Sequence, residues 1–236
     1  MQMTNKWKKI WSDKVYNNEN IELSELIELD GFDTGFTGFT EQEWKDMTAD
    51  AAMRSSLKSG DTILEVGCGG GAFLYCLNAK YDVRVYGLDY SSSLIDVAKK
   101  VIPTGYFSVS EAKLYSYGLN FFDRIYSHGV FFYFESYEYA FSVLEKCYSG
   151  LKVGGSLCLM EVNDLSTKAE YLAERQGAFG SKEEYNKKYE GLDHLFFDKK
   201  RLSRDLVEIG FTNVQFFDHK IANGSESFRF NLLAKK

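Results

Sequence analysis

The sequence predicts an α/β fold in which a doubly wound, mostly parallel sheet of seven strands ends in an antiparallel hairpin. Three observations lead to this prediction. Short apolar runs alternate with helical segments through the middle of the chain, a pattern typical of parallel strands joined by right-handed crossovers. A glycine-rich turn follows the first of these runs, residues 62–66. Two apolar runs near the C-terminal end, residues 214–218 and 227–234, stand too close together for a crossover and indicate a hairpin.

Residues 1–58 are expected to form an N-terminal helical cap on this sheet. A helix is predicted from Lys6 to about Asn17, because apolar residues recur on one of its faces. Residues 31–39 alternate glycine with aromatic residues, which is typical of a loop, and this loop is expected to form the acceptor pocket together with residues 165–197. Thr40 and Glu43 have the spacing of a capping box and predict the start of the next helix.

Residues 59–163 are expected to form the core of the sheet. Its strands are short apolar runs, and helical segments separate most of them. The predicted strands cover residues 62–66, 83–88, 105–109, 122–127 and 156–161. The predicted helices cover residues 72–79, 92–101 and 137–149.

Residues 164–199 form an insertion that is polar and has helical patterning. It follows a strand whose carboxyl end borders the ligand crevice of an open α/β sheet. We therefore expect this segment to be a lid over the substrate. Residues 200–236 supply a helix and the closing hairpin, so that the chain is expected to form a single domain.

The composition argues against several classes of protein. A length of 236 residues is enough for one domain that buries its core without disulfides or metal. The formal charge of −6 leaves no general basic surface for a nucleic-acid backbone. The four cysteines form no C-x-x-C pair and no cluster with histidine, so no metal site is expected and packing roles are favoured.

The same sequence shows no sign of a membrane or secretory segment. No apolar run approaches the roughly 20 residues of a membrane-spanning helix. Residues 1–9 lack the apolar centre of a secretory signal. We expect a cytoplasmic protein with a small-molecule substrate and neither nucleic acid nor membrane as a partner, and a homodimer is left open.

The motif with most functional content runs from Ile63 to Gly71, where an apolar strand ends in Glu65 and then a glycine-rich turn. Asp89 closes the next apolar run. The order strand, tight turn, helix, strand, acid is the layout of a nucleoside-binding half-domain. Glycines in the turn permit positive φ angles and allow a ligand to approach the main chain closely.

Glu65 decides which nucleoside the turn favours. Residues 67–72 also satisfy the G-x-G-x-x-G/A pattern of dinucleotide sites, but one such match is weak evidence. Two residues before Gly67 on a strand, Glu65 faces the same side and brings a carboxylate to the turn. That charge would repel a diphosphate and attract the ammonium and sulfonium groups of S-adenosylmethionine.

These residues resemble the class I (Rossmann-like) S-adenosylmethionine-dependent methyltransferases of the small-molecule type. The resemblance rests on five ordered signals spread over about a hundred residues, and it implies S-adenosylmethionine as cofactor and S-adenosylhomocysteine as product. The signals are residues 65–71, 85–91, 110–112, 122–130 and 151–157.

The resemblance assigns roles to single residues around the cofactor. Asp89 would grip both ribose hydroxyls, with a helix N-cap as the alternative. Tyr90 would stack on the adenine, with packing against the next helix as the alternative. Glu111 with Ala112 would meet the adenine amino group, with a plain surface acid as the alternative for Glu111. The expected cofactor-binding residues are Glu65, Gly67, Cys68, Gly69, Gly71, Asp89, Tyr90, Glu111, Ala112 and Ser127.

Two histidines are the candidate catalytic residues. His128 follows Ser127 at the end of the fourth strand, which faces the transferred methyl group in this fold, and it would orient the cofactor or substrate; a structural role is the alternative. His194 lies in a His-and-aromatic segment like that of ubiquinone-pathway O-methyltransferases, and an imidazole with a pKa of ~6.5 suits a general base. A surface loop histidine or a helix-cap partner is the alternative for His194.

The acceptor is expected to be a small molecule methylated on a hydroxyl, such as a sugar, a sugar nucleotide or a phenol- or quinone-like compound. The sequence after the fourth strand is Ser127-His128-Gly129-Val130, and it lacks the Asn/Asp-Pro-Pro-aromatic and Pro-Cys signatures of nucleic-acid methylation. Two alternatives stay open. Tyr148 and Lys152 give a formal Tyr-x-x-x-Lys for an NAD-dependent oxidoreductase, and a catalytically inactive cofactor-binding partner protein would share the same fold.

Overall fold

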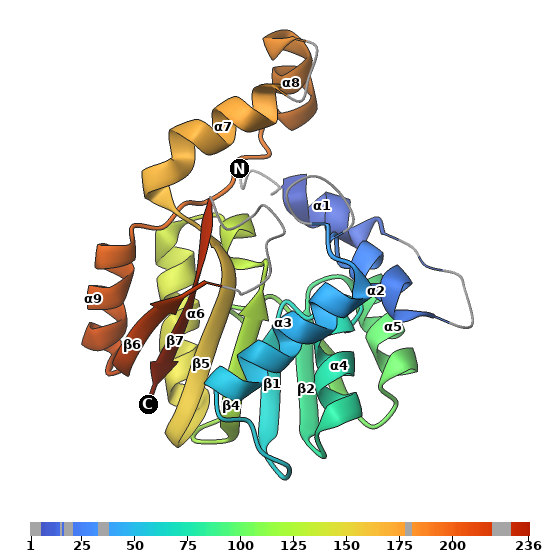
Figure 1. The fold of residues 1–236 in the computed structure, drawn as a ribbon, viewed down its shortest axis with the longest axis vertical. Coiled ribbons are helices and arrows are strands. Elements are labelled where there is room, and N and C mark those ends of the chain that lie inside the picture. The colour runs from blue at the N-terminus through green and yellow to red at the C-terminus, as the bar shows by residue number, and fades with distance from the viewer. Residues whose placement is uncertain (1–5, 15, 17–20, 33–37, 178–180, 219–227) are drawn as a thin grey trace.

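The computed structural model of the protein describes residues 6–14, 16, 21–32, 38–177, 181–218 and 228–236. These residues form a seven-stranded sheet with the order β3-β2-β1-β4-β5-β7-β6 (Figure 1). The strands from β1 to β5 pair in parallel, and β7 runs antiparallel to both β5 and β6. The predicted fold class is confirmed. The strands are β1 (Thr62–Val66), β2 (Arg84–Asp89), β3 (Tyr106–Val109), β4 (Phe122–His128), β5 (Leu151–Asn163), β6 (Thr212–Phe217) and β7 (Arg229–Lys235).

The strand order creates the position for a ligand. The chain moves outward from β1 to β3 and then returns to place β4 on the other side of β1. Connections from neighbouring strands therefore leave in opposite directions at the carboxyl ends of β1 and β4, which opens a crevice there.

Helices cover both faces of the sheet and bury a separate apolar cluster on each face. One cluster contains side chains from α2, α3, α4 and α5, and the other contains side chains from α6 and α9. Figure 1 shows these two groups on opposite sides of the strands. The helices are α1 (Lys6–Ser12), α2 (Leu23–Leu29), α3 (Glu41–Arg54), α4 (Ala72–Lys80), α5 (Ser92–Val101), α6 (Tyr137–Gly150), α7 (Lys168–Gly177), α8 (Lys182–Tyr189) and α9 (Lys199–Ile209), with short 3-10 turns η2 (Phe131–Tyr133) and η3 (Leu165–Thr167).

The N-terminal cap follows the prediction in part. Thr40 and Glu43 form both hydrogen bonds of the capping box at the start of α3, as the spacing indicates. α1 ends at Ser12 rather than near Asn17, and none of its residues is buried, so little packing extends it. Residues 15 and 17–20 of the expected helix lie outside the described residues, as do residues 33–37 of the expected loop.

β5 is longer than the run 156–161 indicates. It begins at Leu151, which pairs with Phe122 of β4, and the residues between Leu151 and Ser156 bulge out of this pairing. It ends at Asn163 after a second irregularity against β7, where Glu161 has a φ of +59°. Such bulges re-aim side chains at sheet ends.

The segment 164–199 contains α7 and α8, which extend beyond the carboxyl ends of the strands (Figure 1). Tyr171 of α7 packs with Phe196 and Phe228 in a small apolar cluster that ties this segment to the residue preceding β7. That the segment acts as a lid stays a prediction. None of the helices within the described ranges has both the length and the apolar character to cross a lipid bilayer.

Trp44 anchors the cap on the core, and its removal should destabilise the fold. The side chain is 1% exposed, and its indole N–H donates to the carbonyl oxygen of Ala72 at 3.3 Å. Trp44→Ala should lower the free energy of unfolding by about 3–5 kcal/mol, because it leaves a cavity of aromatic size. Urea denaturation measures this. Met53→Ala, which changes a side chain 64% exposed on the same helix, should cost far less; equal losses would contradict the anchoring role.

Candidate active site

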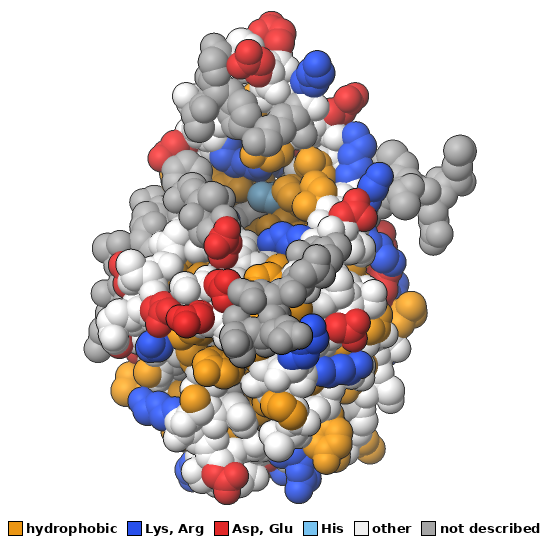
Figure 2. Space-filling model, turned by 90° about the vertical axis from the view of Figure 1, so that its right-hand side faces the viewer, with side chains coloured by type: hydrophobic (Ala, Val, Ile, Leu, Met, Phe, Trp, Pro, Cys, Tyr) orange, Lys and Arg blue, Asp and Glu red, His pale blue; other side chains and the backbone are white. Residues whose placement is uncertain are grey.

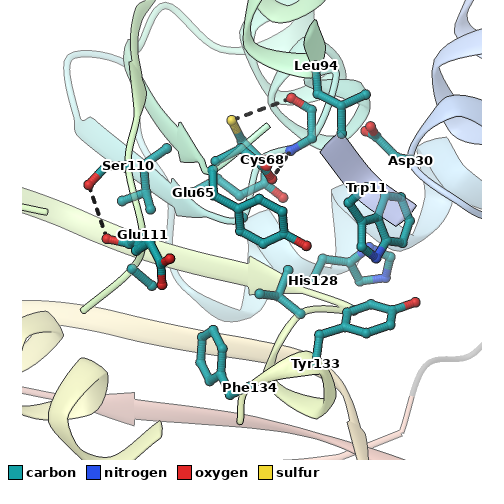
Figure 3. Close-up of a pocket in the computed structure, with 18 of the residues that line it drawn as sticks. Trp11, Asp30, Glu65, Cys68, Leu94, Ser110, Glu111, His128, Tyr133 and Phe134 are labelled. Carbon is teal, nitrogen blue, oxygen red and sulfur yellow. Dashed lines mark hydrogen bonds between the residues drawn. The ribbon is translucent and has the colours of Figure 1, made fainter. Parts of the chain in front are cut away.

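A cavity of about 600 Å³ opens at the carboxyl ends of β1, β2 and β4 (Figure 3). Glu65 of β1, Asp89 of β2 and His128 of β4 lie on its wall. Trp11 of α1 and Tyr133 of η2 contribute to the aromatic part of the wall. This size is typical of small-molecule sites, and the cavity lies at the switch point of the strand order.

The glycine-rich turn between β1 and α4 uses its amides within the protein. The amides of Gly67 and Cys68 both donate to the carbonyl oxygen of Leu88, at 2.8 and 2.9 Å. The amide of Gly69 donates to Asp89 Oδ2 at 3.1 Å. The amide of Gly71 donates to the carbonyl oxygen of Cys68 at 2.9 Å.

Asp30, the residue after α2, takes the two remaining amides of this turn. Its Oδ1 accepts from the amide of Gly70 at 2.5 Å, and its Oδ2 accepts from the amide of Ala72 at 3.1 Å. Gly69 has a φ of +52°, and a Cβ added there would lie 2.2 Å from Asp30 Oδ1, so only glycine fits. A dinucleotide site requires free amides at this turn to bind a phosphate group. Here every amide from residue 67 to residue 72 already has an acceptor within the protein.

Three carboxyl groups surround this turn, and burial disfavours their ionised forms. Burial raises the pKa of Asp30 to about 7, against the hydrogen bonds from Gly70 and Ala72 that lower it. Burial raises the pKa of Glu65 well above its usual range, and the charges of Asp30 and Asp89 raise it further. Burial also raises the pKa of Asp89. A cation placed among these groups would favour their ionisation, so the site is electrostatically suited to a positively charged ligand.

Glu65 shows the need for such a ligand most directly. Its side chain is 2% exposed, and its Oε2 atom has no hydrogen-bond partner among the described residues. A buried carboxyl oxygen without a donor costs free energy. The ammonium group of S-adenosylmethionine supplies the donors and the charge that this atom lacks, so the residues present fit that molecule.

Ser110 and Glu111 lie across the cavity from Asp30 and Trp11 (Figure 3). Glu111 forms an ion pair with Lys8 of α1 and accepts a hydrogen bond from the hydroxyl of Tyr139 at 3.2 Å. The carboxylate of Glu111 therefore already has partners in this structure.

Other cofactor candidates divide into two groups. Tyr90 and Ala112 line the cavity, as do Gly67, Cys68 and Gly69 of the turn. Ser127 and Gly71 do not lie among the lining residues: Ser127 Oγ donates to the carbonyl oxygen of Val66 at 2.9 Å, and Gly71 is the N-cap of α4.

Helix capping does not require Asp89. Ser91 is the N-cap residue of α5, and its side chain accepts from the amide of Leu94. Asp89 Oδ1 accepts from the amide of Ser91 at 2.8 Å, and Oδ2 accepts from the turn. The carboxylate thus has a fixed orientation at the cavity wall, and its role toward ribose stays a prediction.

The imidazole of His128 lies in an aromatic enclosure. It stacks on Phe32 with ring centroids 4.5 Å apart and meets the edge of Trp44 at 5.1 Å. His128 is 4% exposed and lines the cavity together with both aromatic residues. The histidine therefore stands at the apolar end of the cavity, beside the position expected for the acceptor.

His194 is not among the residues that line this cavity. Its ring stacks on Trp7 with centroids 4.8 Å apart and meets Tyr133 edge-on at 5.4 Å. Tyr133 lines the cavity, so His194 lies one aromatic layer behind the wall. Burial and the charges of Arg175 and Arg229 hold the pKa of His194 well below its usual value. A catalytic role for His194 stays a prediction.

The sequence analysis missed Asp30, Trp11 and Trp44 as residues of the site, whereas Phe32 belongs to the loop 31–39 that it expected at the acceptor pocket. Asp30 ends an amphipathic segment and precedes a glycine, and this pattern is common to helix ends in general. Trp11, Phe32 and Trp44 come from three parts of the cap and meet at one cavity. The only sequence signal for Trp11 and Trp44 is the abundance of aromatic residues, 16 Tyr and 19 Phe with 3 Trp.

Comparison with known proteins shows the fold and a family model that matches the core of the chain. Residues 64–159 match the family model described as a methyltransferase domain. The matched residues are therefore similar to a methyltransferase domain, and the chain shares the fold of solved methyltransferases. The resemblance predicted from the sequence is confirmed, and neither an oxidoreductase nor an inactive partner protein gains support.

The similar proteins include several phosphoethanolamine N-methyltransferases. The enzyme of Plasmodium falciparum is 25% identical over 184 residues, which are 74% of this chain and 68% of that protein. Phosphoethanolamine N-methyltransferase 1 of Arabidopsis thaliana is 29% identical over 128 residues, which are 52% of this chain and 26% of that protein. The chain thus matches about a quarter of the Arabidopsis protein's length.

Solved structures share the fold of this methyltransferase domain. Haemonchus contortus phosphoethanolamine N-methyltransferase 2, in complex with phosphomonomethylethanolamine and S-adenosylhomocysteine, superposes with a TM-score of 0.60 at 14% identity. The match covers 92% of this chain and 61% of that chain.

Asp30 should make the stability of the ligand-free protein depend on pH. Because its folded pKa is about 7 instead of 3.8, the folded state holds a proton that the unfolded state releases between these values. The resulting stabilisation is present at low pH and is lost as pH rises through 7. Wild type should therefore lose stability relative to Asp30→Asn between pH 5 and pH 8, as measured by urea unfolding.

Asp82→Asn is the matched control, because it removes an exposed carboxyl group outside the cavity. Its unfolding free energy should follow the wild-type pH profile. A constant difference between Asp30→Asn and wild type across this pH range would contradict the proton uptake assigned to Asp30.

Proposed function

We propose that this protein transfers a methyl group from S-adenosylmethionine to a small-molecule acceptor. The observation that carries the proposal is the turn between β1 and α4, where acceptors within the protein use every amide from residue 67 to residue 72. Three carboxyl groups, of Asp30, Glu65 and Asp89, lie around this turn, and their surroundings favour a cation. A diphosphate has neither donors nor favourable charge there. A sulfonium compound with an ammonium group has both.

The residues on the cavity wall support a consistent orientation for the methyl donor. Glu65 would accept from the ammonium group, and Asp89 would accept from the ribose hydroxyls. Tyr90 and Ala112 would contact the adenine. Glu111 would accept from the adenine amino group, either in place of its ion pair with Lys8 or in addition to it.

Methyl transfer needs few catalytic side chains. S-adenosylmethionine supplies an electrophilic methyl group on sulfur. The protein has to hold the acceptor in line with that methyl group and exclude water, and such positioning can supply roughly 7–11 kcal/mol. The aromatic enclosure of His128, Phe32 and Trp44 supports both tasks at the acceptor end.

The acceptor nucleophile has two candidates. A hydroxyl group is the expectation from the sequence resemblance. An amine is the second candidate, because the similar proteins named above are N-methyltransferases of phosphoethanolamine. Methyl uptake from labelled S-adenosylmethionine onto matched amino and hydroxy compounds distinguishes the two, and uptake by nucleic acid alone would contradict both.

Calorimetric titration should separate the proposed function from the oxidoreductase. S-adenosylhomocysteine should bind and NAD should not, because the amides of the turn are already occupied. Binding of NAD alone, or of neither compound, would overturn the proposal.

Asp89→Ala should weaken binding of S-adenosylhomocysteine by about 1.5–3 kcal/mol, through loss of charge-assisted hydrogen bonds. Asp96→Ala, an exposed change on α5, is the matched control and should leave affinity unchanged. Isothermal titration of both variants measures this. Wild-type affinity in Asp89→Ala would remove the residue from the ribose role.

A further inference from the structure

A second group of polar side chains lies next to the cavity and is not used by the proposed chemistry. It consists of Tyr171 and Arg175 of α7, His194, and Arg229 of β7, and we call it the α7 cluster. Tyr171 donates or accepts a hydrogen bond with His194 Nδ1 at 2.8 Å, and Arg175 Nη1 lies 3.5 Å from the same atom.

Positive charge exceeds negative charge in this cluster. Arg229 pairs with Glu161 at 2.8 Å, and its Nε donates to Asn163 Oδ1 at 3.2 Å. Arg175 makes no ion pair with a carboxylate among the described residues, and its guanidinium instead lies 4.2 Å from the ring centroid of Tyr189. Of the two guanidinium groups, only that of Arg229 pairs with a carboxylate among the described residues. The half-buried guanidinium of Arg175 therefore leaves an excess of positive charge, which favours an anion.

His194 adds a donor that has no acceptor. A guanidinium group only donates, so the contact with Arg175 makes Nδ1 of His194 an acceptor. Since the imidazole is neutral, its proton then lies on Nε2. Nε2 is buried and has no hydrogen-bond partner among the described residues. An anionic oxygen would supply the missing acceptor.

The α7 cluster adjoins the acceptor end of the methyl-transfer cavity. Phe132 lies under the guanidinium of Arg229 at 4.7 Å and 4.9 Å from the ring of His194. The next residue, Tyr133, lines the cavity itself and contacts the ring of His194. Figure 2 shows a hollow below the uppermost part of the molecule in which a histidine lies among apolar and basic side chains.

We propose that the α7 cluster binds an anionic oxygen group, a phosphate or a carboxylate, on the methyl acceptor. The inference rests on the proposed function and adds the substrate class: a small molecule with its nucleophile at one end and an anion at the other. Arg175, Arg229 and His194 Nε2 donate to the anion, while the nucleophile reaches the cavity past Tyr133. His194 is then a substrate-binding residue that acts as a donor.

Three compounds with a common aminoethyl group test the anion preference on protein saturated with S-adenosylhomocysteine. Phosphoethanolamine carries a phosphate, β-alanine a carboxylate and ethanolamine a hydroxyl. At least one of the two anionic compounds should bind ten-fold or more tightly than ethanolamine by calorimetry. Which of them does so identifies the anion. Equal affinities for all three, including no binding by any, would overturn the inference.

Variants locate the preference in the α7 cluster. Arg175→Gln should reduce the anion preference ten-fold or more, and Arg204→Gln, which changes an exposed arginine of α9, should keep it. His194→Phe retains an aromatic ring but lacks the Nε2 donor, and it should raise KM for the anionic acceptor with a smaller effect on kcat. A general base would instead show its loss in kcat and in the pH profile.

S-adenosylhomocysteine binding separates the two proposals. Intact binding of that compound with no anion preference would overturn only the role of the α7 cluster. If the wild-type protein did not bind S-adenosylhomocysteine, the proposed function would be overturned. In the variants, unchanged affinity for S-adenosylhomocysteine and an unchanged melting temperature show that the fold is retained. If Arg175→Gln then kept the anion preference, this result would contradict the role of the α7 cluster.

Discussion

The structure depends on how carboxylates occupy the turn between β1 and α4. Asp30 and Asp89 accept from three amides of that turn, and its other amides bond to backbone carbonyl groups. In a dinucleotide site, the corresponding amides face a diphosphate. Here carboxyl groups of the protein occupy that place, and the remaining acid, Glu65, has an oxygen without a hydrogen-bond donor among the described residues. A cation favours the ionisation of these carboxyl groups, so the crevice is suited to a cationic nucleoside.

The N-terminal cap connects this charged end of the cavity with the α7 cluster. Lys8 of α1 pairs with Glu111, and Trp11 of the same helix lines the cavity. The indole N–H of Trp7 donates to the carbonyl oxygen of Asp193 at 3.0 Å, and its ring stacks on His194. A helix with no buried residue thus owes its position to contacts with both ends of the site. The carboxyl groups at one end suit a cationic methyl donor, and the guanidinium groups at the other end suit an anionic methyl acceptor.

Much of the fold could be predicted from local patterns. The capping box at Thr40 and the alternation of strands with helices depend on residues close together in the chain, where sequence spacing defines geometry. The bulges that lengthen β5 could not be predicted in this way. They arise from pairing with β4 on one side and β7 on the other, so they depend on partners distant in sequence.

By itself, the sequence determined the sheet, the glycine-rich turn and the acid at its entry, because each follows from neighbouring residues. Only the tertiary structure decided which side chains share the site. Asp30 reaches the turn across 40 residues of sequence, and His194 meets Tyr171, Arg175 and Arg229 from separate elements. Burial and nearby charges depend on such distant neighbours, so folding and not the local sequence sets the pKa of a carboxyl or imidazole group.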